Sequence, residues 1–327
     1  MTRLTRRNLF KGAAAATAAT ALTPLLGENA RAAESVGKGT GVYRYKLGDF
    51  EVIQLMDGAR TVPIADNFVV NASKDDAIKA AAAAYMPDGK ITIPFSPMIV
   101  NTGSKLVAID TGNGLGANAA TKGAVGQTRL NMEAAGIDPK KIDIVVISHF
   151  HGDHIGGLKN ADGSPAFPNA EIKVPAAEWA FWKDDANAEK ANPFNKALFP
   201  AVKKIIDGLK FTPFEADKEV APGITSVATP GHTPGHTSFV VASGPKKIFV
   251  QSDVTNIPDL FVRHADWQAA FDNDPNLTIA TRRKVYDMAA AEKLTIVGYH
   301  WPYPCIGHVE KDGAGYRLVP VAWDPNG

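Results

Sequence analysis

The chain has 327 residues, with 35 basic and 34 acidic side chains and a net charge of +1. This even balance gives no electrostatic reason to expect a nucleic acid or an anionic membrane as partner. The single cysteine, Cys305, excludes an intrachain disulfide. A chain of this length buries enough surface to fold without one, so we expect stability to come from packing and from any bound metal.

Residues 1–32 have the features of an export signal. A basic start containing Arg6-Arg7 leads into a largely apolar run and then into Ala30-Arg31-Ala32, which fits the small-x-small cleavage rule. The paired arginines favour twin-arginine translocation and a periplasmic or secreted protein. A membrane anchor is the weaker alternative, because Pro24 interrupts a run that is already short for a bilayer. Cleavage after Ala32 would leave no anchor.

Beyond the signal we expect a flexible tail over residues 33–41 and one domain over residues 42–327. Apolar periodicity and turn signals predict strands at 43–47, 50–56, 97–101, 105–110, 142–148, 224–228, 238–242, 247–251 and 294–298. Start and stop signals predict helices at 75–85, 127–135, 176–183, 196–208 and 278–292. Strands dominate each half, with helices between and after them. This order predicts sheets packed together and covered by helices.

Four potential metal ligands follow the predicted strand 142–148 at once: His149, His151, Asp153 and His154. The loop after a strand is where folds usually place reactive groups. Burying three imidazoles and a carboxylate without partners would be costly, so a purely structural role is disfavoured. The residue types and their spacing therefore predict a metal site.

Three later residues repeat this placement at strand ends. His232 lies in a loop rich in Pro and Gly after strand 224–228, Asp253 follows strand 247–251, and His300 follows strand 294–298. Each has an ordinary explanation on its own, as a turn or surface histidine or as a helix-capping aspartate. Their repeated position favours one shared site instead.

Together these motifs resemble the metallo-β-lactamase superfamily. The residues that carry the resemblance are Asp110 within Ile109-Asp110-Thr111-Gly112, the motif His149-x-His151-x-Asp153-His154, then His232, Asp253 and His300. Segments 45–51, 100–107 and 307–321 are further similar to methyl parathion hydrolase and its relatives. The resemblance implies an αββα sandwich, in which two mixed sheets are flanked by helices and the site lies at the open edge of the sheets.

The resemblance also implies a pair of divalent metal ions. His149, His151 and His232 would bind one ion, Asp153, His154 and His300 the other, and Asp253 would bridge them. Imidazole and carboxylate without thiolate suit Zn, Fe, Mn or Co, and we favour zinc. A bridging hydroxide would then attack the substrate, with Asp153 or Asp253 receiving the proton.

Four more residues are assigned around the metals. Asp110 would orient a ligand or hold a nearby loop, unless it is an ordinary turn aspartate, and His236 would support a ligand or brace its own loop. By the resemblance, Trp182 and Phe194 are the candidates for the substrate pocket. Apolar walls favour neutral substrates, namely esters, lactones or organophosphate triesters. The relatives carry an aromatic residue near 115–117, where this chain has Leu115-Gly116-Ala117, which favours esters and lactones over triesters.

Three other functions are compatible with part of this pattern, and one feature of the sequence disfavours each of them. A β-lactamase is disfavoured because that group generally lacks an aspartate where Asp253 stands. A glyoxalase II-like thioesterase would share the ligand set, but its helical C-terminal domain is not evident. An exported binding protein with an idle site is disfavoured because the whole ligand set is present. Segment 57–97 is longer than such a fold needs and would be a homodimer arm or a lid over the pocket. The expected partners are otherwise a small-molecule substrate and the twin-arginine export machinery.

Overall fold

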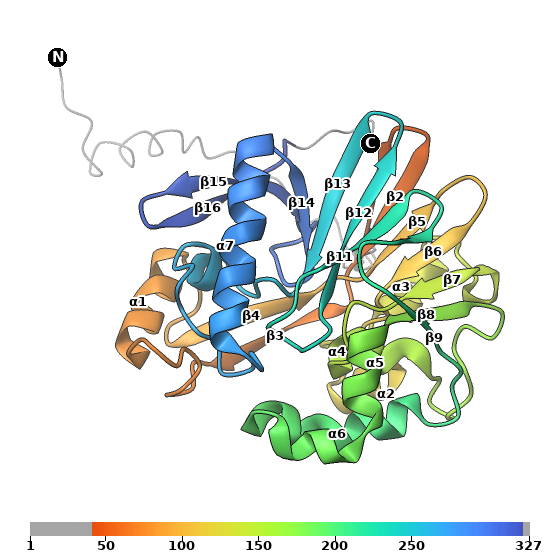
Figure 1. Ribbon diagram of the computed structural model, residues 1–327, viewed down its shortest axis with the longest axis horizontal. Coiled ribbons are helices and arrows are strands. Elements are labelled where there is room, and N and C mark those ends of the chain that lie inside the picture. Colours follow the sequence, from red (N-terminus) through yellow and green to blue (C-terminus); the bar gives the residue numbers. More distant parts are fainter. Residues whose placement is uncertain (1–40, 323–327) are drawn as a thin grey trace, which may run out of the picture. The chain divides into compact units, whose positions relative to one another are not determined.

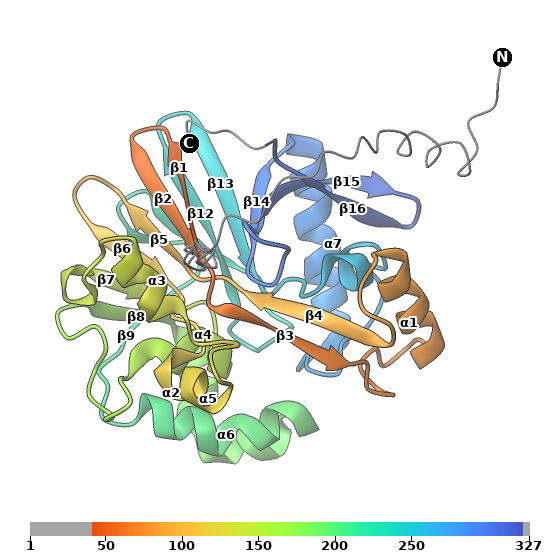
Figure 2. The same ribbon diagram turned by 180° about the vertical axis from the view of Figure 1, so that it is seen from behind.

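The computed structural model describes residues 41–322 (Figures 1 and 2). The predicted signal at 1–32, and all of the predicted tail except Gly41, therefore lie outside the described residues. Between residues 41 and 322, no helix has both the length and the apolar character needed to cross a membrane.

Two seven-stranded sheets form the centre of the described chain. The first has the order β1 (Val42–Leu47), β2 (Phe50–Leu55), β5 (Met98–Asn101), β6 (Leu106–Ile109), β7 (Ile144–Val146), β8 (Glu171–Pro175) and β9 (Thr212–Phe214). The second has the order β10 (Glu219–Ala221), β11 (Ile224–Ala228), β12 (Thr237–Ser243), β13 (Lys246–Ser252), β14 (Thr295–Gly298), β15 (Ile306–Asp312) and β16 (Gly315–Pro320). Strands β6 to β9 pair in parallel, as do β13 and β14.

Helices cover the outer faces of both sheets, except that the first helix along the chain packs against the segment between β2 and β5. They are α1 (Lys74–Ala83), α2 (Gly114–Ala120), α3 (Thr128–Ala134), α4 (Gly152–Ile155), α5 (Ala176–Lys183), α6 (Pro193–Ile206) and α7 (Pro275–Glu292). Helix α7 lies along the second sheet, while α5 lies beside β8 and β9 and packs against α6 (Figure 1). Asn192 and Asp274 cap α6 and α7, because each side chain accepts a hydrogen bond from a backbone N–H in the first turn.

The alternation of side chains along each strand builds the layers. Val52 and Val100 point into the core between the sheets, where they share a cluster with Phe239 of the second sheet. Their neighbours Ile53 and Ile99 point to the opposite face, in a cluster that also contains residues of α5 and α6. Residues of α7 pack against the outer face of the second sheet. These layers, helices, sheet, sheet and helices, confirm the predicted αββα sandwich.

Segment 57–97 contains a two-stranded sheet, formed by β3 (Gly58–Pro63) and β4 (Lys90–Phe95). The sequence patterns did not predict these two strands. Helix α1 lies between these strands in the sequence and close to them in space (Figures 1 and 2). Arg60, Val62, Ile93 and Phe95 of this hairpin line the cavity described below. The segment therefore forms part of a cavity wall, and pairing of two chains through it stays a prediction.

Candidate metal centre

The predicted ligands meet at the ends of four strands. The loop after β7 carries His149 to His154, and the loop after β11 carries His232. Asp253 directly follows β13, and His300 is the second residue after β14. The predicted strand 142–148 is shorter in the structure, Ile144–Val146, because the chain leaves the sheet early to place Ser148 and His149 at its edge.

The side-chain atoms form three overlapping groups, each close enough to hold one ion. These groups are His149, His151 and His232; His149, His154 and Asp253; and Asp153, His154 and His300. The first and third are the two sets that the resemblance implied. The second joins His149 and His154, one member from each set, to Asp253, as expected for a shared carboxylate.

Buried ligand atoms without partners show that these residues fit metal ions. His149 Nε2, His154 Nε2 and Asp253 Oδ1 are buried and receive no hydrogen bond from the described residues. His232 Nε2 and His151 Nδ1 face each other at 3.0 Å. Leaving such atoms unpaired in the interior is costly, and a cation among them would satisfy all of them.

Hydrogen bonds hold the opposite nitrogen of three imidazoles. His149 Nδ1 lies 3.0 Å from Ser148 Oγ, and His151 Nε2 donates to Asn195 Oδ1 at 2.6 Å. His232 Nδ1 donates to Asp272 Oδ1 at 2.9 Å. Such bonds fix the ring and its tautomer, so that the free nitrogen carries the lone pair a metal needs.

Asp110 orients two groups of the motif loop, as one of the two sequence interpretations expected. Its carboxylate accepts from Ser148 N and from His154 Nδ1, both at 2.8 Å. Asp110 has a φ of 59°, a left-handed conformation that costs a non-glycine residue energy. His300 is held in a comparable way, because its Nδ1 donates to the carbonyl of Pro94 in β4 at 2.8 Å.

His236 braces the backbone at Asp253. Its Nδ1 donates to the carbonyl of Thr229 at 2.9 Å, and its Nε2 accepts from the backbone N–H of Asp253 at 3.0 Å. Both ring nitrogens are thereby used. His236 thus supports a candidate ligand through its backbone and braces its own loop, which combines the two sequence interpretations.

Burial keeps two of the candidate imidazoles, those of His149 and His151, uncharged. It lowers the pKa of His149 and of His151 well below the usual range, so both rings are neutral at neutral pH, which is the form that binds metal. For Asp253, burial alone would raise the pKa, but His300 and His154 beside it hold the pKa well below its usual value. The carboxylate therefore stays ionised.

Glu178, a residue missed in the sequence, ties the two ligand loops together. It is fully buried in the first turn of α5. Its carboxylate accepts from Phe150 N at 2.9 Å, Gly235 N at 2.9 Å and Trp182 Nε1 at 2.7 Å. Burial raises the pKa of Glu178, and the N–H of Phe150 opposes that rise. Only glycine fits at 235, because a Cβ there would lie 2.1 Å from Glu178 N.

Asp272 and Arg282 form a second support that the sequence did not reveal. Asp272 holds His232, and Arg282 Nη2 lies 3.7 Å from the other oxygen of Asp272. Arg282 is itself buried and donates to the carbonyls of Ala265 and Trp267. The signal available in the sequence was weak, because Arg282 stands in a basic run with Arg283 and Lys284, and Asp272 stands in a polar turn with Asp274.

Five of the candidate ligands, His151, Asp153, His232, Asp253 and His300, line a cavity of about 420 Å³, and the fully buried His149 and His154 lie behind them. Phe68, Phe194 and Phe271 are among its walls. That Phe194 contacts a substrate there stays a prediction. Trp182 is a correction: it does not line this cavity but is fully buried in the core behind His151, where it donates to Glu178. The resemblance implied a place in the pocket wall for Trp182, but packing places its ring in the core.

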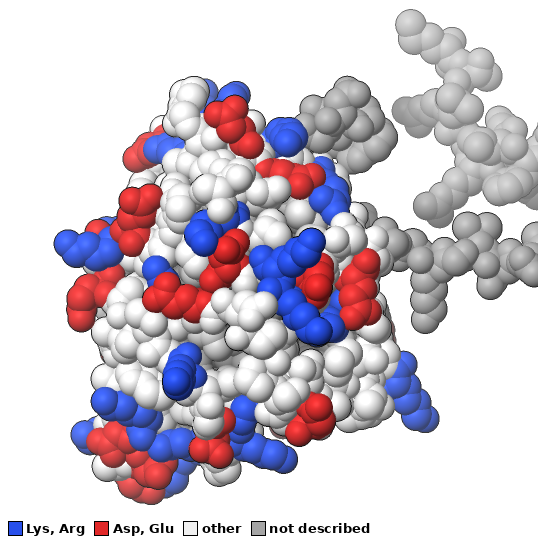
Figure 3. Space-filling model, turned by 90° about the vertical axis from the view of Figure 1, so that its right-hand side faces the viewer, with Lys and Arg blue, Asp and Glu red and all other residues white. Residues whose placement is uncertain are grey.

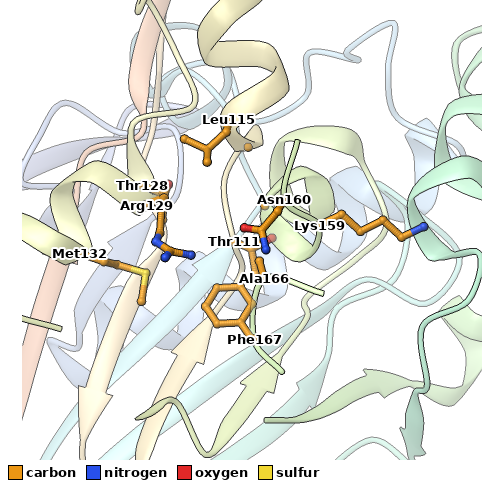
Figure 4. Close-up of a pocket in the computed structure, with 11 residues that line it drawn as sticks. Thr111, Leu115, Thr128, Arg129, Met132, Lys159, Asn160, Ala166 and Phe167 are labelled. Atoms are coloured by element: carbon orange, nitrogen blue, oxygen red, sulfur yellow. The ribbon is translucent and has the colours of Figure 1, made fainter. Parts of the chain in front are cut away.

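Leu115 lines a different and much smaller cavity, together with Thr111, Arg129 and Asn160 (Figure 4). Its volume of about 20 Å³ suits a water molecule and no substrate. Residues 115–117 thus contribute nothing to the wall of the metal cavity. On the face drawn in Figure 3, basic and acidic side chains are interspersed, which agrees with the balanced net charge.

Residues 96–300 match the profile of the Metallo-beta-lactamase superfamily. The chain belongs to this superfamily. Its fold and its motif order are those that the sequence predicted. The finer resemblance, to the methyl parathion hydrolase group, stays a prediction.

Lactonases and hydrolases are among the similar proteins. The chain is 27% identical over 192 residues to an N-acyl homoserine lactonase of Bacillus sp, spanning 58% of this chain and 64% of that protein, a little under two thirds of its length. The solved structure of AidC, a dizinc quorum-quenching lactonase in complex with an N-acyl homoserine product, is 28% identical with a TM-score of 0.78, covering 87% of this chain and 98% of AidC. The hydrolase AbOPH is 26% identical with a TM-score of 0.80, covering 88% and 99%. The predicted metal-dependent hydrolase and the predicted pair of zinc ions agree with these relatives.

Proposed function

We propose that this protein is a two-metal hydrolase that opens lactone rings, with N-acyl homoserine lactones as its substrate class. One observation carries the proposal: the groups of candidate ligands overlap through His149 and His154, and members of each group line a cavity with apolar walls. A cavity of this kind with an open side suits catalysis better than a closed structural site. The lactonase relatives supply the substrate class.

The assignment of ligands follows the groups in the structure. His149, His151 and His232 would hold one zinc ion, Asp153, His154 and His300 the second, and Asp253 both. When bound, such a pair of ions lowers the pKa of a water molecule and polarises the ester carbonyl.

The chain's own residues position the ester and handle the proton. Phe194 and Phe271 exclude water from one side of the cavity and offer an apolar surface to an acyl chain. Asp153 is the most accessible of the candidate ligands, with a side chain 22% exposed, and lies 3.4 Å from His300 Nε2. Its carboxylate oxygens can therefore take up the proton and pass it to the departing ring oxygen. Asp253, buried and ionised, keeps its negative charge throughout.

The test is a panel of neutral substrates given to the purified protein: N-hexanoyl homoserine lactone, an aryl ester, an organophosphate triester and a β-lactam. We expect the highest kcat/KM for the lactone, loss of all activity with a chelator, and recovery on adding zinc. A protein that binds zinc and leaves the lactone intact while cleaving another member of the panel would overturn the assignment.

We also propose that the protein is exported through the twin-arginine pathway to the periplasm or beyond. The support is the sequence alone, with Arg6-Arg7 in a basic start and Ala30-Arg31-Ala32 at its end. Fractionation of a bacterial host should find the native chain outside the cytoplasm and lacking residues 1–32. The variant with Lys at positions 6 and 7 should remain inside, and equal export of both chains would contradict the proposal.

A further inference from the structure

Tyr299 is a buried tyrosine that contacts one set of candidate ligands. It follows β14, directly precedes His300 and is 4% exposed. Its hydroxyl donates to the backbone carbonyl of Asp153 at 2.5 Å. Its ring stacks on the imidazole of His154, with the ring centroids 3.9 Å apart. Asp153, His154 and His300, the second set below, are the group that would hold one of the two ions.

The contact with Asp153 matters because helix α4 is a single turn. A helix of four residues leaves most of its carbonyls without a partner inside the helix. The carbonyl of His154 accepts from Thr111 N and from Thr111 Oγ1, both at 2.8 Å, and the carbonyl of Asp153 accepts from Tyr299. Thr111 and Tyr299 thus hold, from outside the helix, the turn that carries two candidate ligands.

The other group of ligands, the first set below, consists of His149, His151 and His232 and has different supports. His151 is held by Asn195 and His232 by Asp272. Between residues 41 and 322, the hydroxyl of Tyr299 bonds only to Asp153, and its ring contacts the imidazoles of His154 and His300 but none of the first set. A change at Tyr299 should therefore be felt at the second set alone.

We infer that Tyr299 is a positioning residue for the metal ion of the second set. The inference rests on the two-metal centre of the proposed function. The hydroxyl fixes the turn that carries Asp153 and His154, and the ring limits rotation of the His154 imidazole. The described residues that line the metal cavity do not include Tyr299, so it acts on the reaction only through the ligands. Residues that orient ligands in this way typically change metal affinity by about 10- to 100-fold.

The experiment counts zinc ions per molecule by elemental analysis. The protein is dialysed against a chelator buffer whose free zinc concentration just saturates the native chain. Tyr299→Phe removes the hydroxyl and keeps the ring, so we expect binding at one set to weaken by about 10-fold or more and one ion to be retained instead of two. Tyr299→Leu also removes the stacked ring and should weaken the same set further. Circular dichroism verifies that each variant is folded.

Asn195→Ala identifies the set that Tyr299 supports. This variant removes the partner of His151, so on its own it should weaken the first set and also retain one ion. Combined with Tyr299→Phe it should retain none, because the two changes then weaken different sets. One ion retained by the double variant would mean that both changes act on the first set, and would overturn the inference.

Tyr316→Phe is the matched control. Tyr316 is 2% exposed, and its hydroxyl donates to Asp287 of α7 at 2.5 Å, so the variant removes the same group from another buried tyrosine. It should keep both ions, whatever it costs in stability. Two ions in both Tyr299 variants, or the loss of an ion from Tyr316→Phe as well, would contradict the role of Tyr299 and leave the proposed function standing. A native chain that never holds two ions would contradict the two-metal hydrolase itself.

Discussion

At the scale of single residues, polar side chains behind the candidate ligands set their geometry. Asp110 has a left-handed backbone conformation, with a φ of 59°, and its carboxylate accepts hydrogen bonds from both Ser148 and His154. Strain at such a position persists only where the surroundings over-determine it. Asp272 and Asn195 play the same orienting part for His232 and His151. These hydrogen bonds fix the positions of the candidate ligands.

Glu178 offers the sharpest test at this scale. Glu178→Gln replaces one carboxylate oxygen by an NH₂ group, which cannot accept a hydrogen bond. Because Phe150 N and Gly235 N donate to different oxygens of Glu178, one of these two N–H groups loses its acceptor. We expect zinc affinity at the set of His149, His151 and His232 to fall by about 10- to 100-fold, as for other residues that support ligands. Competition with a chromophoric chelator measures this change. Trp182→Phe is the control: it removes the indole donor and part of the buried ring but leaves Glu178 able to accept from both backbone N–H groups. An equal loss of affinity there would contradict the role given to Glu178.

At the scale of elements, the start of α6 connects helix stability to the metal site. Asn192 caps the helix by accepting from Asn195 N at 2.7 Å, and its Nδ2 donates to the carbonyl of Asp272 at 2.8 Å. The same turn carries Asn195, which holds His151. One cap therefore joins the helix to the loop of Asp272 and to the candidate ligands.

Asn192→Ala should lower the free energy of unfolding by about 1–2 kcal/mol, through loss of the cap and of the bond to Asp272. Denaturation with urea measures the change. Asn192→Asp is the control, since it keeps the capping acceptor and loses only the donor, so it should cost less than the alanine variant. Equal losses for both variants would show that the cap contributes nothing.

Elements with strong local patterns were predictable from the sequence, and contacts between distant segments were not. The turn signal at Gly48-Asp49 identified the strands on either side of it, which pair as β1 and β2. The cluster at 149–154 revealed itself because its residues are adjacent in the chain. Asn195, in contrast, lies 44 residues from His151, and Asp272 lies 40 residues from His232. Nothing local marks such partners, and for the same reason Trp182 was assigned to the pocket when packing places it in the core.

At the scale of the whole molecule, metal binding should contribute to stability. The chain holds one cysteine, buried and free, so no disulfide restrains it. A ligand that binds only the folded state at about 100 times its dissociation constant adds about 2.7 kcal/mol per site. We therefore expect a chelator to lower the unfolding temperature by about 5–10 °C for each site emptied. Differential scanning calorimetry checks this, and zinc but not magnesium should restore the midpoint, because the groups hold too much imidazole for magnesium.

The metal content of the purified protein tests the central claim most directly. After dialysis against metal-free buffer, elemental analysis of the native chain should find two zinc ions per molecule, and Asp253→Ala, which removes the carboxylate shared by both sets, should retain fewer. One ion or none in the native chain after exposure to zinc, or two firmly held ions in the variant, would contradict a two-metal centre built around Asp253.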